Sequence, residues 1–272
     1  VELDGVDEVA AFSDAVTWPL RALDVSDLRA TQTLALDRLL ANPLLRAIRH
    51  LRLYGNRVTG PALRSLEGMR TLEYLDVSRN WLGLDARSMG VLSHVAPSLR
   101  FLDISQNNLG ERAILELAGG FPHVRELGLA SCGITPTGLE LIAEYRHGVE
   151  HLGLSGNPLG DAAIWILSAS PLARSIRTLD LSYCQVTGEG IASLAHAHWP
   201  RLESIELSGN KLSRVAISTL AKGDLPSLVD IRCSESDVRD TNHLRTGHVM
   251  YDRTSTIAGG APGDTRPCFF PS

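Results

Sequence analysis

Serine is the first residue type in this chain whose surroundings suggest catalytic chemistry. Ser155 lies in Gly153-Leu154-Ser155-Gly156, which resembles part of a nucleophile elbow, but the required Gly-x-Ser-x-Gly spacing is not met. Serine recurs after similar leucine-containing strings, at Ser78, Ser105, Ser182 and Ser208. This recurrence favours a repeated structural role over a single nucleophile.

Histidine and cysteine are the remaining candidates for metal or redox chemistry. His196 and His198 are two residues apart in an expected helix, so they point to different faces and do not chelate one ion together. His243, His248 and Cys268 lack a metal-ligand spacing. The phosphate-loop, dinucleotide, zinc-protease and Cys-x-x-Cys motifs are absent. The sequence therefore predicts no enzyme, no cofactor and no metal.

Composition narrows the partner classes further. The 272 residues include 26 basic and 31 acidic ones, for a net charge of −5, so the basic surplus that nucleic-acid binding needs is missing. No stretch approaches the length of about 18 apolar residues that a membrane span requires. We therefore expect neither nucleic acid nor membrane as a partner.

An internal repeat dominates the sequence. The pattern L-x-x-L-x-L-x-x-N-x-L is clear at Ile48, Leu51, Leu53, Asn56 and Val58. Its first position recurs at intervals of 24 to 28 residues, at 20, 48, 72, 99, 124, 149, 176, 202 and 228. Nine matches in one register predict nine similar structural units.

Each position of the repeat has a physical role. The L-x-L alternation has period two and indicates a short strand with one buried face. The asparagine follows the strand, where its amide can pair backbone groups that the turn would otherwise bury. Cysteine replaces it twice, so the expected structural ladder is Asn56, Asn80, Asn107, Cys132, Asn157, Cys184 and Asn210. A helix with an i, i+3, i+4 apolar stripe follows, and a proline often ends it.

One such unit cannot bury its apolar face alone, so the units must stack. The predicted fold class is α/β, a right-handed horseshoe of about nine repeats. Its parallel sheet is concave and its helices are convex, because a helix is wider than the spacing of strands.

The repeat resembles the leucine-rich-repeat superfamily, in particular the ribonuclease-inhibitor-like subtype with a helix in every unit. The resemblance covers residues 1–238, with 1–25 as an irregular N-terminal cap, and the repeat length looks more like that of bacterial members. Residues 239–272 leave the pattern and are expected to form a C-terminal cap, through Val249-Met250-Tyr251, and a flexible tail. The family implies protein recognition through the concave face and names no partner.

Positions three, five and seven of each repeat should point out of the concave face. Aromatic residues and arginine, the usual composition of binding hot spots, gather at its start in His50, Arg52, Tyr54, Tyr74 and Phe101. Beyond them, Gly128 and Gly153 leave the wall bare. Acidic side chains at position five are expected to attract a basic partner surface, namely Asp76, Asp103, Asp180 and Glu206.

The leading hypothesis is a cytoplasmic protein-binding scaffold. Cys132, Cys184 and Cys233 occupy inward positions, which favours reduced, buried thiols and leaves Cys268 as the thiol free to react. One alternative is a regulator of an enzyme, of the GTPase-activating or ubiquitin-ligase substrate-recruiting kind. Another is a purely structural solenoid that self-associates.

Overall fold

The computed structural model describes residues 9, 11–12, 17, 19–27, 33–58, 63–66, 69–80, 82, 98–145, 148–234 and 249–252. Within these residues the chain forms a ten-stranded sheet whose strand order follows the sequence. Every pair of neighbouring strands is parallel. The strands are β1 (Ala22–Asp24), β2 (His50–Arg52), β3 (Tyr74–Asp76), β4 (Phe101–Asp103), β5 (Glu126–Gly128), β6 (His151–Gly153), β7 (Thr178–Asp180), β8 (Ser204–Glu206), β9 (Asp230–Ser234) and β10 (Val249–Asp252).

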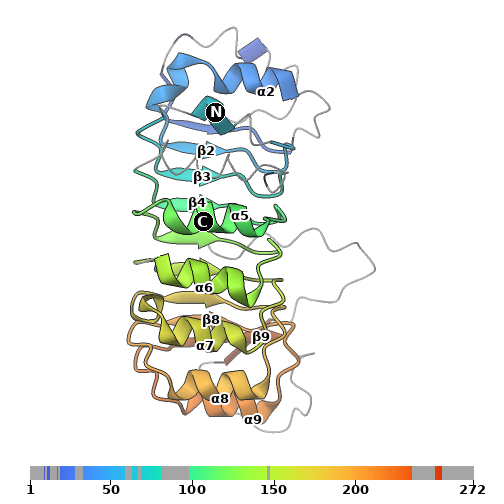
Figure 1. Ribbon diagram of the computed structural model, residues 1–272, viewed down its shortest axis with the longest axis vertical. Helices are drawn as coiled ribbons and strands as arrows, with labels where there is room; N and C mark the ends of the chain where they lie inside the picture. Colours follow the sequence, from blue (N-terminus) through green and yellow to red (C-terminus); the bar gives the residue numbers. More distant parts are fainter. Residues whose placement is uncertain are drawn as a thin grey trace.

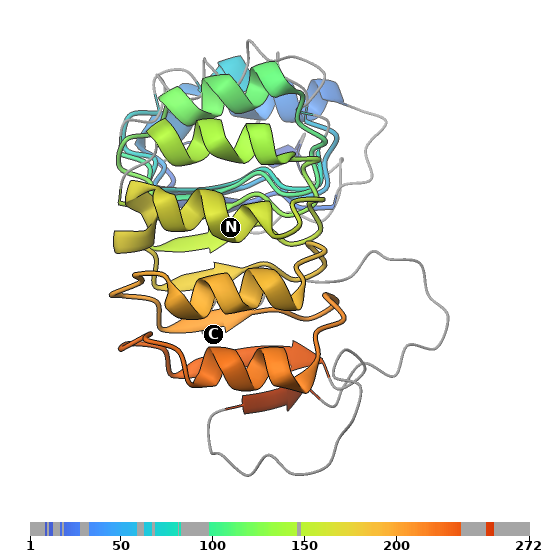
Figure 2. The same ribbon diagram turned by 60° about the horizontal axis from the view of Figure 1, so that its bottom comes forward.

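Helices lie on one face of this sheet and leave the other face uncovered (Figures 1 and 2). The α-helices are α2 (Thr33–Leu40), α5 (Glu111–Gly119), α6 (Pro136–Tyr145), α7 (Ala162–Ala169), α8 (Gly188–His196) and α9 (Arg214–Ala221). Shorter 3-10 helices are η1 (Pro43–Ala47), η2 (Arg64–Leu66) and η4 (Pro171–Arg174). The predicted α/β solenoid with a concave parallel sheet is confirmed. None of the described helices is long and apolar enough to cross a membrane.

The core is a thin apolar layer between the sheet and the helices. The middle residue of each three-residue strand is buried, and these residues pair in register from one strand to the next, as in Leu75 with Leu102. Leucine, isoleucine and valine make up most of the layer, while Trp199 and Phe121 are the large aromatic side chains that are fully buried. The strand alternation of the sequence therefore positions the second face of every strand toward the outside.

The structure places the asparagines after the strands in one buried ladder. In Asn157, Oδ1 accepts hydrogen bonds from the backbone N–H groups of Cys132 and Ile134 at 3.1 and 2.9 Å. Its Nδ2 donates to the carbonyls of Leu129 and Leu154 at 2.8 and 2.7 Å. Asn157 is 0% exposed, so each bond joins groups that water cannot reach. The ladder thus ties each turn to the preceding repeat.

The backbone just before the ladder residue is left-handed in many repeats. Gly156 and Gly209 have φ angles of +70° and +75°, which glycine adopts without steric cost. Tyr183 occupies the same place with φ of 53°, and its ring lies over Gly209, where a Cβ would come within 2.4 Å of Tyr183 Cδ1. This turn reverses the chain direction and starts the segment that leads to the helices.

Strand β10 extends the sheet beyond the last repeat by pairing with β9, from Val249 beside Ile231 to Asp252 beside Ser234. Residues 249–252 therefore occupy the edge that the sequence analysis assigned to a cap. Most of residues 1–25 and 239–272 lies outside the described residues, as do His243, His248 and Cys268. The division into solenoid, caps and tail stays a prediction.

Two ladder thiols are expected to resist chemical modification in the folded protein. Burial raises the pKa of Cys132 and of Cys184 to about 12, and both side chains are 0% exposed. Because the thiolate is the reactive form, alkylation by iodoacetamide should be at least on the order of a hundredfold slower than in urea. Mass spectrometry of the labelled peptides measures this rate. An L115C variant, whose site is 49% exposed, provides the reactive control. Alkylation of Cys132 and Cys184 in the folded protein at the same rate as this control cysteine would contradict their burial.

Candidate functional site

The uncovered face of the sheet presents two columns of side chains, one from the first and one from the third residue of each strand. Parallel pairing in register puts equivalent residues side by side, as Tyr74 lies beside Phe101 and Asp76 beside Asp103. Neighbouring strands are about 4.8 Å apart, so side chains in one column touch. The face is therefore a grid whose chemistry follows directly from positions three and five of the repeat.

An aromatic row occupies the first column over β2, β3 and β4. The rings of His50 and Tyr74 are stacked with centroids 5.7 Å apart, and those of Tyr74 and Phe101 are stacked at 4.0 Å with an interplanar angle of 3°. His50 is exposed and Tyr74 is half-buried, while Phe101 is only 8% exposed. We call His50, Tyr74 and Phe101 the aromatic row. Its accessible end is therefore the His50–Tyr74 end.

Tyr54 lies apart from this row. It belongs to position seven of its repeat, and its hydroxyl accepts a hydrogen bond from Arg79 Nη1 at 2.9 Å. The Arg79 guanidinium also lies 5.8 Å from the centroid of the Tyr54 ring. The sequence predicts one aromatic patch of Tyr54, Tyr74 and Phe101, whereas stacking among the described rings joins Tyr74 and Phe101 with His50.

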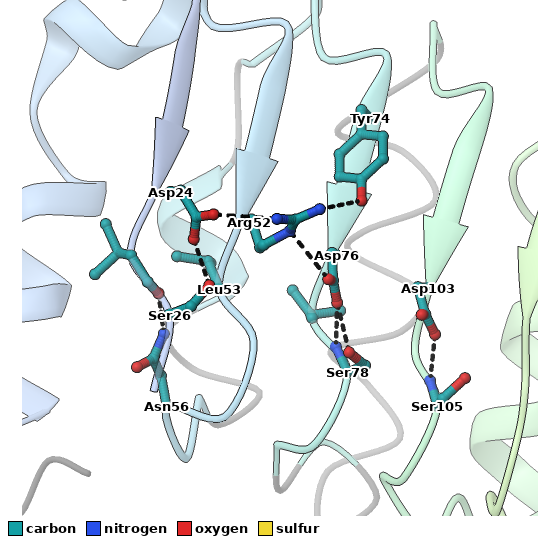
Figure 3. A network of polar contacts seen from close by, with 12 residues as sticks. Asp24, Ser26, Arg52, Leu53, Asn56, Tyr74, Asp76, Ser78, Asp103 and Ser105 are labelled. Carbon is teal, nitrogen blue, oxygen red and sulfur yellow. Dashed lines mark hydrogen bonds and ion pairs between the residues drawn. The ribbon is translucent and has the colours of Figure 1, made fainter. Parts of the chain in front are cut away.

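Arg52 is the centre of a polar network beside the row (Figure 3). Its Nη1 lies 3.2 Å from Asp24 Oδ2 and its Nε lies 3.4 Å from Asp76 Oδ2. Its Nη2 donates to the Tyr74 hydroxyl at 3.1 Å. The hydrogen bond to Tyr74 contributes most to a raised pKa of Arg52. Arg52 therefore neutralises two acids and orients the Tyr74 ring.

The acidic side chains of the second column are less exposed than the sequence suggested. The expectation of an open acidic strip is wrong for Asp76 and Asp103, which are 8% and 5% exposed. The cause is local: each carboxylate folds back and accepts a hydrogen bond from the backbone N–H two residues later, at 3.0 Å from Ser78 and 2.9 Å from Ser105. The recurring Asp-x-Ser string is therefore first of all a turn-forming unit.

Asp180 and Glu206 remain partly accessible at the other end of the column. Asp180 Oδ1 accepts from the backbone N–H and the hydroxyl of Ser182 at 2.9 and 2.5 Å, and burial raises the pKa of its carboxyl. Glu206 Oε1 accepts from the backbone N–H of Ser208 at 2.9 Å. Both are half-buried, so the negative charge that a partner meets lies mainly over β7 and β8.

Asp103 differs from Asp76 in that none of the described basic residues forms an ion pair with it, although the more distant charge of Arg52 lowers its pKa slightly against the other effects. Among the described residues, Arg52 pairs with Asp76, whereas no arginine or lysine forms an ion pair with Asp103. Burial, together with the nearby charge of Asp76, raises the pKa of Asp103 from 3.8 to about 6. At neutral pH this carboxylate carries a buried charge, and within the described part of the chain its hydrogen-bond partner is Ser105. A charge in that state is unfavourable unless a cation approaches it.

A hollow lies next to Asp103, where β5 and β6 carry glycine in the second column. The hollow is open to solvent, and its lining includes Phe101, Asp103, Gly128, Gly153 and Asp180. Glu126 and His151 border it from the first column, and the His151 ring nitrogen Nδ1 lies 2.7 Å from the Thr178 hydroxyl. The bare wall that Gly128 and Gly153 suggested is thus a concave pocket with acidic sides. No group of histidine, cysteine or acidic residues in the described chain is arranged to hold a metal ion.

Sequence reasoning identified the aromatic residues and the bare glycines but missed several neighbours. It did not include Glu126 and His151 as pocket residues, or Arg79 as the partner of Tyr54. Writing the repeats one under another would have found the first two, because they occupy position three beside Phe101. Arg79 lies in the turn, so its contact depends on the left-handed backbone there.

Comparison with known proteins gives the same repeat. A family model described as "Leucine Rich repeat" matches residues 68–88, 122–143 and 173–195. Among curated proteins, tubulin-specific chaperone E of Danio rerio is 27% identical over 174 residues, which cover 62% of this chain and 32% of that protein. Ribonuclease inhibitor of Sus scrofa is 31% identical over 187 residues, which cover 64% of this chain and 40% of the inhibitor.

A solved structure agrees at the level of the fold. The crystal structure of the Rad7 and Elc1 complex in yeast contains a chain that superposes with a TM-score of 0.61 at 16% identity. The superposition covers 93% of this chain and 73% of that one. The chain spans about a third of the length of the two curated relatives described above, so their whole-protein activities extend beyond the matched region.

Proposed function

We propose that this leucine-rich-repeat protein is a protein-binding scaffold that engages its partner through the concave face of the sheet. The observation that carries the proposal is the aromatic row with Arg52 beside it, since stacked rings and an ordered guanidinium form a rigid, amphipathic contact surface. Aromatic residues and arginine are the types that contribute most energy in protein interfaces. The row lies on the face of the sheet that none of the described helices covers, with His50 exposed and Tyr74 half-buried.

The relatives support this class of function. Ribonuclease inhibitor and tubulin-specific chaperone E are named for action on another protein, and the similar solved chain belongs to a complex of Rad7 and Elc1. We extend to this chain only the common element, which is recognition of a protein by a repeat surface. We further propose the ribonuclease-inhibitor-like subtype and, from the short repeats, a bacterial source.

The proposal includes three finer points about the setting. The protein acts by binding and not as an enzyme, because its serines at position seven serve as turn residues, as in Ser78 and Ser105. It works in the cytoplasm, where buried thiols such as Cys132 and Cys184 stay reduced. Its partner is a protein with a basic surface, because Asp180, Glu206 and Glu126 leave negative charge on the concave face.

The test is affinity capture with a matched pair of double variants. His50→Ala with Tyr74→Ala removes the accessible end of the aromatic row and leaves the largely buried Phe101 in place. Leu115→Ala with Trp165→Ala removes apolar side chains that are 49% and 55% exposed on α5 and α7, on the opposite face. Each variant and the wild type are immobilised, exposed to lysate of the source organism and analysed by quantitative mass spectrometry.

We expect the concave variant to lose captured partners by about tenfold or more, because truncating central aromatic residues typically costs more than 1 kcal/mol each. The convex variant should capture the same partners within roughly twofold of the wild type, because isolated apolar residues on a surface need not belong to a binding site. Thermal melts of both variants show that the loss is not unfolding. Equal capture by the wild type and the concave variant would refute the assignment of this face.

A further inference from the structure

We propose that the hollow over Gly128 and Gly153 is a receptor pocket for one arginine side chain of a protein partner. The inference deepens the proposed function and rests on it, since it names the chemical group that the concave face receives. The pocket shares Phe101 with the aromatic row, whereas His50 and Tyr74, the accessible end of the row, are not among its lining residues.

The shape of the pocket comes from two adjacent glycines. Gly128 on β5 and Gly153 on β6 pair in register, so the second column lacks side chains across two strands. Asp103 on β4 and Asp180 on β7 border this gap. The backbones of β4 and β7, the outer two of these four strands, are about 14 Å apart. This distance leaves room for a single extended side chain to reach the sheet between Asp103 and Asp180.

The absence of a side chain at Gly128 also leaves space for the Asp103 carboxylate. A Cβ at residue 128 would lie 2.5 Å from Asp103 Oδ1 and 3.2 Å from the Ser105 hydroxyl oxygen, well inside van der Waals contact. Asp103 therefore leans over the floor of the pocket, into space that any larger residue at 128 would take. The floor and the carboxylate are parts of one arrangement.

The charge of the pocket selects a cation. Asp103, Glu126 and Asp180 line it, and no lysine or arginine is among its described lining residues. Asp103 is 5% exposed, and among the described residues Ser105 supplies its hydrogen bonds, without a counter-ion. Within the described part of the chain, Asp180 accepts hydrogen bonds from Ser182 through Oδ1, so Oδ2 is the oxygen that can receive a donor of the partner. A partner cation would satisfy carboxylate oxygens that the fold leaves with few donors.

Two features favour arginine over lysine and over a metal ion. Phe101 forms the pocket wall toward β4, and a planar guanidinium can stack on an aromatic ring while its N–H groups reach a carboxylate. Asp103 and Asp180 stand three strands apart, too far for one metal ion to bind both, and the described residues contain no metal-type cluster. A broad group with several donors fits this spacing better than a compact ammonium.

The experiment uses short peptides as the probe and the full chain as the receptor. Acetylated and amidated Gly-Gly-Arg-Gly-Gly is titrated into ¹⁵N-labelled protein at about pH 7.5, where Asp103 is ionised. Parallel titrations use lysine or citrulline in place of arginine, and citrulline keeps the shape without the charge. The readout is the shift of the Gly128 and Gly153 amide signals, fitted to dissociation constants.

We expect saturable shifts at these two amides, with the arginine peptide binding about threefold or more tighter than the lysine peptide and about tenfold or more tighter than the citrulline peptide. Equal affinity for lysine would overturn the choice of arginine. Equal affinity for citrulline, or shifts elsewhere without any at Gly128 and Gly153, would overturn the pocket. These comparisons need only the wild-type protein, so they do not depend on how any variant folds.

Variants then assign the effect to named carboxylates. Asp103→Asn with Asp180→Asn should weaken the arginine peptide by about tenfold or more, because both substitutions keep shape and remove charge. Glu140→Gln is the matched control: it removes one negative charge from an exposed site on α6, on the helix side of the sheet, and it should change affinity by less than about twofold. Unchanged binding by the double variant would refute the proposal.

The outcome is separable from that of the proposed function. If the aromatic-row variant loses its captured partners but the arginine peptide does not bind, the scaffold stands and the pocket falls. If the carboxylate variants weaken peptide binding but the aromatic-row variant captures the same partners as the wild type, the pocket stands. The contact surface for the partner then lies outside the aromatic row.

Discussion

Replacing Asp103 with asparagine should raise the free energy of unfolding at about pH 7.5 by on the order of 3 kcal/mol. Most single substitutions in a folded protein lower stability, so an increase of this size would be conspicuous. The reason is that the wild-type carboxylate is 5% exposed and lacks a counter-ion among the described residues. Asparagine keeps an oxygen that accepts the hydrogen bond from Ser105 and removes the buried charge.

The sign of the pH dependence follows from the direction of the pKa shift. Burial raises the pKa of Asp103 to about 6 in the folded state, whereas the unfolded chain keeps its ordinary value of 3.8. Between these two values the folded protein binds a proton that the unfolded protein has released, so stability decreases as the pH rises through this window. The difference between the variant and the wild type should therefore vanish near pH 4 and be complete above about pH 7.

Urea denaturation of both proteins across this range measures the effect. Carbon-13 NMR of the Asp103 carboxyl provides an independent check, with an expected midpoint near 6 in the folded protein. A variant that is less stable than the wild type at neutral pH would show that the hydrogen bonds of the carboxylate outweigh its desolvation. The proposed arginine pocket is consistent with this lower stability, because a bound cation stabilises a buried carboxylate most when that carboxylate has no other counter-ion.

Replacing Asn157 with alanine should lower the free energy of unfolding by about 4 kcal/mol or more. The side chain is 0% exposed, and its removal leaves the N–H groups of Cys132 and Ile134 and the carbonyl of Leu129 without the amide as partner, while the Leu154 carbonyl keeps the Cys184 thiol as a donor at 3.1 Å. Each buried group that loses its hydrogen bond costs about 1–3 kcal/mol.

The cysteines of the ladder provide a matched comparison. Cys132 Sγ donates to the Ile104 carbonyl at 3.2 Å, so a thiol retains part of the role of the amide. Asn157→Cys should therefore cost clearly less than Asn157→Ala, by roughly 1–2 kcal/mol. Urea denaturation gives the stabilities, and hydrogen exchange should show the largest loss of protection in β5 and β6. A cost below about 1 kcal/mol for Asn157→Ala would mean that the ladder does not stabilise the solenoid.

The repeat pattern could be predicted from sequence alone because it is a local and periodic property. The alternation around Leu51 and Leu53 requires a strand with one buried face, and stacking requires every strand to be parallel. The same logic places Tyr74 beside Phe101, since residues at one position of the repeat must align in a column. The aromatic row and the bare glycines are therefore visible in the sequence.

What the tertiary structure decided is the state of each side chain within the columns. The sequence determines that Asp76, Asp103, Asp180 and Glu206 share a column, but it does not determine which of them meets solvent or a cation. That depends on contacts between repeats: Arg52 reaches Asp76 on the next strand, while Gly128 lets Asp103 lean into a hollow whose described lining residues include no lysine or arginine. The period of the repeat determines the strand and column in which each residue lies. Burial and ion pairing depend instead on distances of a few ångströms between side chains of different repeats, and the sequence of one repeat does not contain this information.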